Sequence, residues 1–92
     1  MKYIAIEREV TPVPEHVKAN ILRLEALKVK ELMSNGLVLE IFFNQAHCAV
    51  LILEGSDISA VLKALTTLPL VREKYISFEI HELHPYDGFE RV

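Results

Sequence analysis

The chain has 92 residues, of which 51% are hydrophobic and 25% charged, and its formal net charge is −3. That length fits one domain, and a negative balance without a basic cluster argues against a nucleic-acid-binding protein. A single cysteine, Cys48, excludes an intrachain disulfide and a cysteine-based zinc site.

The apolar residues bear on location and on assembly. No stretch approaches the roughly 20 apolar residues that cross a bilayer. The N-terminus lacks the apolar core of a secretory signal, so we expect a cytoplasmic protein with no membrane partner. A short chain buries a smaller share of its surface than a long one does. The high hydrophobic content therefore predicts self-association.

The first third of the chain predicts a strand followed by a helix. In residues 2–8, Ile4 and Ile6 alternate with Tyr3, Ala5 and Glu7, which predicts a strand. Pro12 and Pro14 end this pattern and favour a helix start. Residues 15–34 are rich in Leu, Ala, Glu and Lys, which predicts a helix ended by the left-handed cap of Asn35-Gly36.

The predicted helix carries two apolar stripes and a set of charged residues. One stripe can cover a sheet, and the second widens that contact or meets another subunit. Basic and acidic residues are interspersed, which fits a solvated face. The first stripe holds Val17, Ile21, Leu24 and Leu32, and the second holds Leu22, Ala26, Val29 and Met33. The charged residues are Lys18, Arg23, Glu25, Lys28, Lys30 and Glu31.

Two further strands are expected at residues 37–43 and 48–54, both apolar and β-branched or aromatic in part. Four residues separate them, which is short enough for an antiparallel hairpin. A second helix should follow, with Ser56 or Asp57 as N-cap and Pro69 as its stop.

The remaining residues complete one domain that spans residues 1–92. Residues 75–83 predict a last strand, and residues 85–92 form a polar and aromatic C-terminal tail. Tyr86 and Phe89 in that tail could clamp a neighbouring subunit or belong to a frayed end.

The element order β-α-β-β-α-β predicts a ferredoxin-like α+β sandwich, a four-stranded antiparallel sheet with two helices on one face. We expect the helices to cover Ile4, Ile6, Leu39, Ile41, Phe43, Phe78 and Ile80. The other, open face is then expected to carry Tyr3, Ala5, Glu7, Val38, Glu40, Phe42, Ser77, Glu79 and His81. Such a mixed face can lie in solvent or be covered by a second sheet.

Three segments resemble the muconolactone isomerases. Residues 64–85, ALTTLPLVREKYISFEIHELHP, resemble that family's helix ending in Leu-Pro-Leu, its strand with a central Glu and its later His-Pro. Residues 45–57 are similar to its Gly-His-Tyr-Ala segment, with His47 at the His position, and residues 25–36 resemble the end of its first helix. Where the family has Trp-Arg, this chain has Phe42-Phe43 and then Asn44.

The resemblance implies a dimeric α+β barrel, in which two sheets pair face to face around a cavity, and a cofactor-free isomerase. Its reaction on a small unsaturated lactone or carbonyl compound is a proton transfer that needs a base and a group that stabilises an enolate. Glu79 is the expected base, Glu40 could share the proton, and His81 could donate to the oxyanion. The expected substrate-binding residues are Tyr3, Glu7, Phe42, Ser77 and His47.

Two other interpretations of these residues stay open. Glu79 and His81 could simply lie on a solvated strand face. The chain could also be a non-catalytic module that binds a small molecule or another subunit, which the missing Arg favours. A metal site is not expected, because His81 and His84 lie three residues apart on a strand and point to opposite sides.

Overall fold

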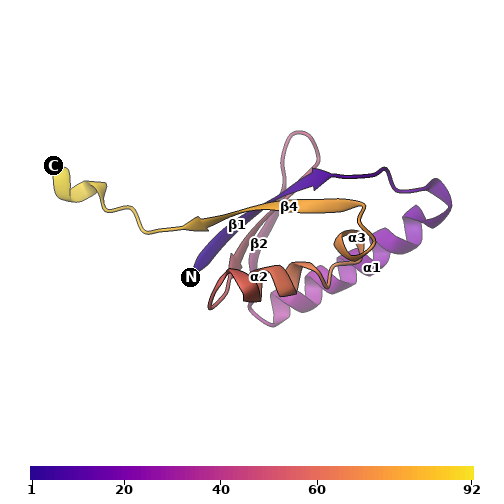
Figure 1. Ribbon diagram of the computed structural model, residues 1–92, viewed down its shortest axis with the longest axis horizontal. Helices are drawn as coiled ribbons and strands as arrows, with labels where there is room; N and C mark the ends of the chain where they lie inside the picture. Colours follow the sequence, from indigo (N-terminus) through magenta and orange to yellow (C-terminus); the bar gives the residue numbers. More distant parts are fainter.

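The computed structural model describes residues 1–92 as one sheet with helices on one side (Figure 1). The strand order is β2-β3-β1-β4, and each neighbouring pair is antiparallel. The predicted ferredoxin-like α+β arrangement is therefore confirmed. The elements are β1 (Lys2–Glu9), α1 (Glu15–Ser34), β2 (Val38–Phe43), β3 (Ala49–Glu54), α2 (Ile58–Leu65), α3 (Pro69–Arg72), β4 (Ile76–Leu83) and the 3-10 turn η1 (Gly88–Arg91).

The main core lies between the sheet and the helices. Its largest fully buried side chains come from β2, from β3, which is central in the sheet, and from α2 and the segment after it. Removing these apolar surfaces from water is the main term that stabilises such a small domain. The nine buried residues of this cluster are Tyr3, Ala5, Leu32, Val38, Leu51, Leu53, Val61, Leu65 and Leu68.

The direction of the β1 side chains differs from the prediction. Tyr3 and Ala5 are buried under the helices, and Ala5 lies opposite Leu51 on one side and Ile80 on the other. Residues directly opposite in a sheet share a face, so Ile4 and Ile6 point to the open face. The prediction was wrong because both faces of β1 are apolar, and alternation alone cannot choose between them.

A bulge explains the corrected facing of β2. The register shifts between Val38, opposite Leu53, and Glu40, opposite Ile52. The extra residue, Leu39, lets Val38 and Ile41 both pack on the helix side although they are three positions apart. The predicted placement of Val38 is thus wrong, whereas that of Glu40, Ile41, Phe42 and Phe43 agrees with the register.

Helix ends follow the sequence signals with one exception. Asp57 caps α2 by accepting the backbone N–H of Ala60 at 2.9 Å, and Gly36 takes the left-handed conformation after α1, with φ of 77°. Pro69 does not stop α2, which already ends at Leu65. It occupies the first position of α3, where its missing N–H costs nothing.

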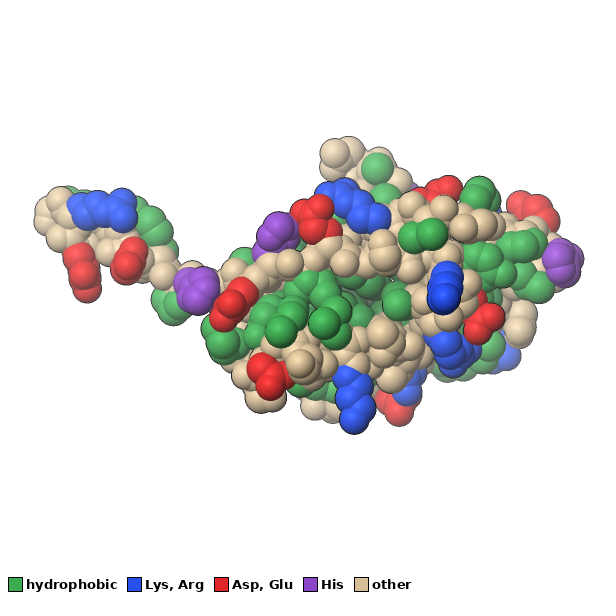
Figure 2. Space-filling view, viewed as in Figure 1, with side chains coloured by type: hydrophobic (Ala, Val, Ile, Leu, Met, Phe, Trp, Pro, Cys, Tyr) green, Lys and Arg blue, Asp and Glu red, His purple; other side chains and the backbone are tan.

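The C-terminal arm, residues 84–92, leaves the sheet beyond β4 and stands clear of the body (Figures 1 and 2). Tyr86 and Phe89 contact each other edge to face, with ring centroids 4.8 Å apart, and both are exposed. None of the helices is long and apolar enough to cross a membrane.

The packing predicts a large stability loss when a fully buried core side chain is shortened. Replacing Leu51, only 1% exposed at the sheet centre, by Ala should lower the free energy of unfolding by about 2–5 kcal/mol. Urea denaturation followed by circular dichroism measures this loss. Leu62→Ala on α2, where the side chain is 48% exposed, should cost clearly less. Equal losses in the two variants would contradict this account of the core.

Candidate functional site

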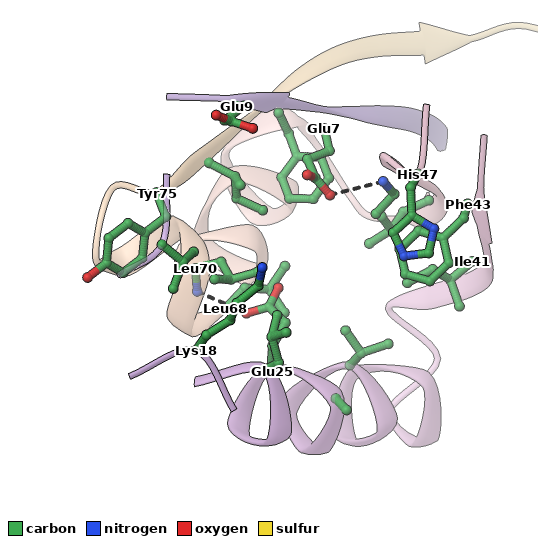
Figure 3. A pocket seen from close by; sticks show the side chains of 18 of the residues that line it. Glu7, Glu9, Lys18, Glu25, Ile41, Phe43, His47, Leu68, Leu70 and Tyr75 are labelled. Carbon is green, nitrogen blue, oxygen red and sulfur yellow. Dashed lines mark hydrogen bonds between the residues drawn. The ribbon is translucent and has the colours of Figure 1, made fainter. Parts of the chain in front are cut away.

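A cavity of about 660 Å³ lies between α1 and the helix-facing side of the sheet (Figure 3). Of its 20 lining residues 13 are hydrophobic, so it suits the apolar body of a small molecule. Its walls come from the end of β1, the β2–β3 hairpin, α1, α3 and the start of β4. The site therefore lies within a single chain, on the face of the sheet that the helices cover.

Glu25 lies in the wall that α1 contributes. It sits four residues after Ile21 and seven before Leu32, both buried, and so belongs to the stripe that faces the sheet. One of its carboxylate oxygens accepts the backbone N–H of Leu70 at 2.9 Å. Burial raises the pKa of Glu25, the hydrogen bond from Leu70 opposes this, and the charge of Glu7 adds to the rise.

Glu7 reaches the same cavity from the opposite side. In Figure 3 its carboxylate projects from β1 while that of Glu25 rises from α1. Glu7 is half-buried and accepts the backbone N–H of Ala49 at 3.0 Å. Two exposed charges, Glu9 and Lys18, complete the ionic groups of the lining.

The β2–β3 hairpin holds His47 at the rim. The side-chain oxygen of Asn44 accepts the N–H groups of Ala46 and Cys48, each at 3.0 Å, and so fixes the turn. His47 adopts φ of 60° there, and its ring stacks on Phe43 with centroids 4.0 Å apart. Both rings line the cavity (Figure 3).

The open face of the sheet carries a separate charged cluster. Arg8 donates to Glu79 at 2.7 Å, and Nε2 of His81 lies 2.6 Å from the other carboxylate oxygen. The hydrogen bond from Arg8, followed by that from His81, lowers the pKa of Glu79 to about 2. A carboxylate that is so weakly basic accepts a proton poorly near neutrality.

The sheet divides the residues that the sequence grouped in one site. Glu7 and His47 line the cavity, and Tyr3 lies in the core, where burial raises its pKa. The prediction that Tyr3 and Glu7 share the open face with Glu79 is wrong, because the register of β1 turns them toward the helices. The remaining candidates lie on the open face: Glu40, Phe42, Ser77, Glu79 and His81.

Sequence reasoning missed Glu25 and Lys18 as cavity residues. Both were assigned to a solvated helix face because basic and acidic residues are interspersed along α1. The signal for Glu25 was its spacing from Ile21 and Leu32, which puts a carboxylate on the buried stripe. The sequence carried no comparable signal for Lys18. Its side chain is exposed, and only the packing of α1 on the sheet brings it to the cavity.

The solved structure of a muconolactone isomerase has the same fold. It superposes with a TM-score of 0.80 and 15% sequence identity, over 96% of this chain and 93% of that chain. No protein-family model matches the chain, and no curated protein matches it in sequence. The likeness confirms the architecture that Leu68-Pro69-Leu70 and its surroundings suggested. At this identity it shows the fold alone.

The ion pairs of Glu79 predict a specific acid sensitivity. A carboxyl whose pKa is lowered by folding stabilises the protein above its unfolded pKa and loses this effect as the pH falls through its folded value. For Glu79 that window runs from pH 4.5 to about 2. The melting temperature of the wild type should therefore fall more steeply across it than that of Glu79→Gln.

Thermal melts over this pH range, at low and high salt, measure the effect. Glu73→Gln removes another exposed, paired carboxylate and controls for the change in net charge. Parallel curves for the wild type and Glu79→Gln would show that the pairs with Arg8 and His81 are not formed in solution.

Proposed function

We propose that the protein isomerises a small unsaturated lactone or carbonyl compound by moving a proton inside the cavity, with Glu25 as the base. The observation that carries the proposal is a half-buried carboxylate in a largely apolar cavity. A base works best when its pKa is near the working pH, and burial moves Glu25 in that direction. The fold shared with a muconolactone isomerase supports this reaction class by analogy only.

The chemistry needs no oxidant or reductant. Glu25 takes a proton from a carbon beside the substrate's conjugated carbonyl system, and the electron pair of that C–H bond moves to the carbonyl oxygen as an enolate. The carboxylic acid then returns the proton one position along the conjugated chain as the carbonyl re-forms. The double bond has moved, and Glu25 is again a carboxylate.

The surroundings of Glu25 suit this role. The N–H of Leu70 holds one oxygen, which fixes the carboxylate and leaves the second oxygen to exchange the proton. Leu68 and Leu70 line the cavity beside it, so the Leu-Pro-Leu stretch supplies both the anchoring N–H and apolar wall. An apolar wall excludes water and strengthens the electrostatic interactions of the charged intermediate.

Two lining residues can donate to the enolate oxygen. The His47 ring can donate from a nitrogen at the rim, and the exposed Lys18 ammonium adds a contact that water weakens. We propose His47 and Glu7 as substrate-binding residues, as expected from the sequence, because both line the cavity.

The charged cluster on the open face is the competing location for the base. Glu79, the base predicted from the sequence, is exposed and held by Arg8, and these features favour Glu25 on physical grounds. Both assignments are open to the same experiment. A module that binds the lactone without converting it is the second candidate function.

We further propose that a second copy of the chain covers the open face, as the high hydrophobic content suggested. The register turns Ile4 and Ile6 of β1 and Val50 and Ile52 of β3 to this face, and Phe42 of β2 extends the apolar area. Phe42 is 55% exposed. Apolar area in the middle of a sheet with charges along β4 suits sheet-on-sheet packing.

The two candidate bases can be separated by substitution. Glu25→Gln should slow proton exchange at the carbon beside the carbonyl by about 100-fold or more, the usual range for a general base, whereas Glu79→Gln should retain the wild-type rate. The measurement is incorporation of deuterium from heavy water into unsaturated lactones, followed by NMR. It detects proton transfer even when no net product accumulates.

The fold of Glu25→Gln provides its own control. Gln keeps an acceptor for the Leu70 N–H. Folding raises the pKa of the Glu25 carboxyl, so the ionised form of Glu25 destabilises the fold at neutral pH. The melting temperature of Glu25→Gln should therefore equal or exceed the wild-type value. Undiminished exchange in a folded Glu25→Gln variant would remove Glu25 from the mechanism. Lactones that raise the melting temperature of the wild type without exchange would identify a binding module.

Assembly is tested on the same face. Light scattering should give at least a dimer at micromolar concentration for the wild type, and Ile52→Lys should shift it to single copies by placing a charge in the contact. Leu27→Lys on α1, where Leu27 is 53% exposed, is the matched control and should keep the wild-type size. A wild-type protein of single-copy mass would end the proposal of face-to-face pairing.

A further inference from the structure

We infer from the charges of the cavity that its ligand carries no carboxylate: the site takes an uncharged lactone or carbonyl compound, and tolerates a cationic substituent on it. The inference rests on the proposed function, because it names the substrate class of the same site. It rests on the arrangement of Glu7, Glu9, Glu25 and Lys18 around one apolar space.

The negative charges lie on two sides of the cavity. Glu7 enters from β1 and Glu25 from α1, and both are half-buried (Figure 3). Glu7 accepts the backbone N–H of Ala49 with one carboxylate oxygen, and Glu25 accepts that of Leu70 in the same way. Neither carboxylate forms an ion pair with a cationic side chain. A ligand between them meets negative charge from both walls, and Glu9 adds a third carboxylate to the lining.

The one ammonium group of the lining does not offset these charges. The Lys18 side chain is 51% exposed, so water screens it. Its Nζ also lies 4.0 Å from a carboxylate oxygen of Glu15, one turn earlier on α1. A ligand carboxylate would gain a screened contact with Lys18 while it is repelled by partly desolvated Glu7 and Glu25.

The rest of the wall suits an uncharged body. Leucine, isoleucine and valine side chains fill the floor, and the stacked pair of Phe43 and His47 closes one side. A planar unsaturated ring can pack on that pair with little loss of conformational freedom. Its carbonyl then remains within a site that offers an ammonium and an imidazole as donors.

Binding of three matched lactones to the full-length protein tests the inference. They share one unsaturated lactone ring and differ in the side group: a carboxymethyl group, its methyl ester, or a trimethylammoniomethyl group. Isothermal titration calorimetry at neutral pH and low salt should give the ester and the ammonium compound an affinity at least about tenfold above that of the carboxylate. Raised salt should reduce the difference in affinity between the ammonium compound and the carboxylate.

Substitutions connect the preference to the cavity. Glu7→Gln and Glu25→Gln should each reduce the ratio of the affinity for the ammonium compound to that for the carboxylate by about threefold or more. Each substitution removes a negative charge that repels the ligand carboxylate. Glu31→Gln is the matched control, because it removes the same charge from an exposed site on α1, where Glu31 pairs with Lys28. It should leave the preference unchanged.

The outcomes separate this inference from the proposed function. A carboxylate that binds as tightly as the ester, or more tightly, overturns the inference while leaving proton transfer intact. An ester that binds in preference but exchanges no deuterium upholds the inference and overturns catalysis. Failure of all three compounds to bind overturns both. An unchanged preference in Glu7→Gln and Glu25→Gln shows that these carboxylates do not set it.

Discussion

The pairing register of β1 is the constraint on which the rest of the site depends. β1 lies between β3 and β4, and Ala5 is opposite Leu51 and Ile80. A shift by one residue would exchange the two faces of the strand. Glu7 would then leave the cavity for the open face, and Ile4 and Ile6 would turn under the helices. The register is held from both sides, so the position of Glu7 is a property of the whole sheet.

The hydrogen bond between Glu25 and Leu70 joins two functions in one contact. It gives the short helix α3 a partner for an N–H at its start, and it orients a carboxylate in an apolar wall. Glu25 occupies a position on the sheet-facing stripe of α1 where an apolar side chain would stabilise the fold more. Placing a charge there is the kind of local conflict that marks functional sites.

The two faces of the sheet offer different chemistry. On the helix side, burial weakens the acidity of Glu25; on the open side, Arg8 strengthens that of Glu79. The surroundings thus shift the pKa values of two carboxyl groups in opposite directions. Desolvation raises that of Glu25, and the adjacent Arg8 lowers that of Glu79. Because the two carboxylates lie on opposite faces of the sheet, we propose different roles for these faces. The cavity would bind the ligand, and the apolar strands of the open face would contact a second copy of the chain.

The sequence by itself determined the order of the main elements, the left-handed cap at Gly36 and the fold class, because these depend on local periodicity and turn chemistry. It left the N-cap of α2 open between Ser56 and Asp57, and the structure assigns the cap to Asp57. The sequence also placed the β4 side chains correctly, since Ser77, Glu79 and His81 contrast sharply with Phe78 and Ile80. Only the tertiary structure decided the facing of β1, where both sides are apolar, and of β2, where a bulge at Leu39 breaks the alternation. It alone brought Glu7, Glu25 and His47 to one cavity, because elements far apart in the chain form its walls.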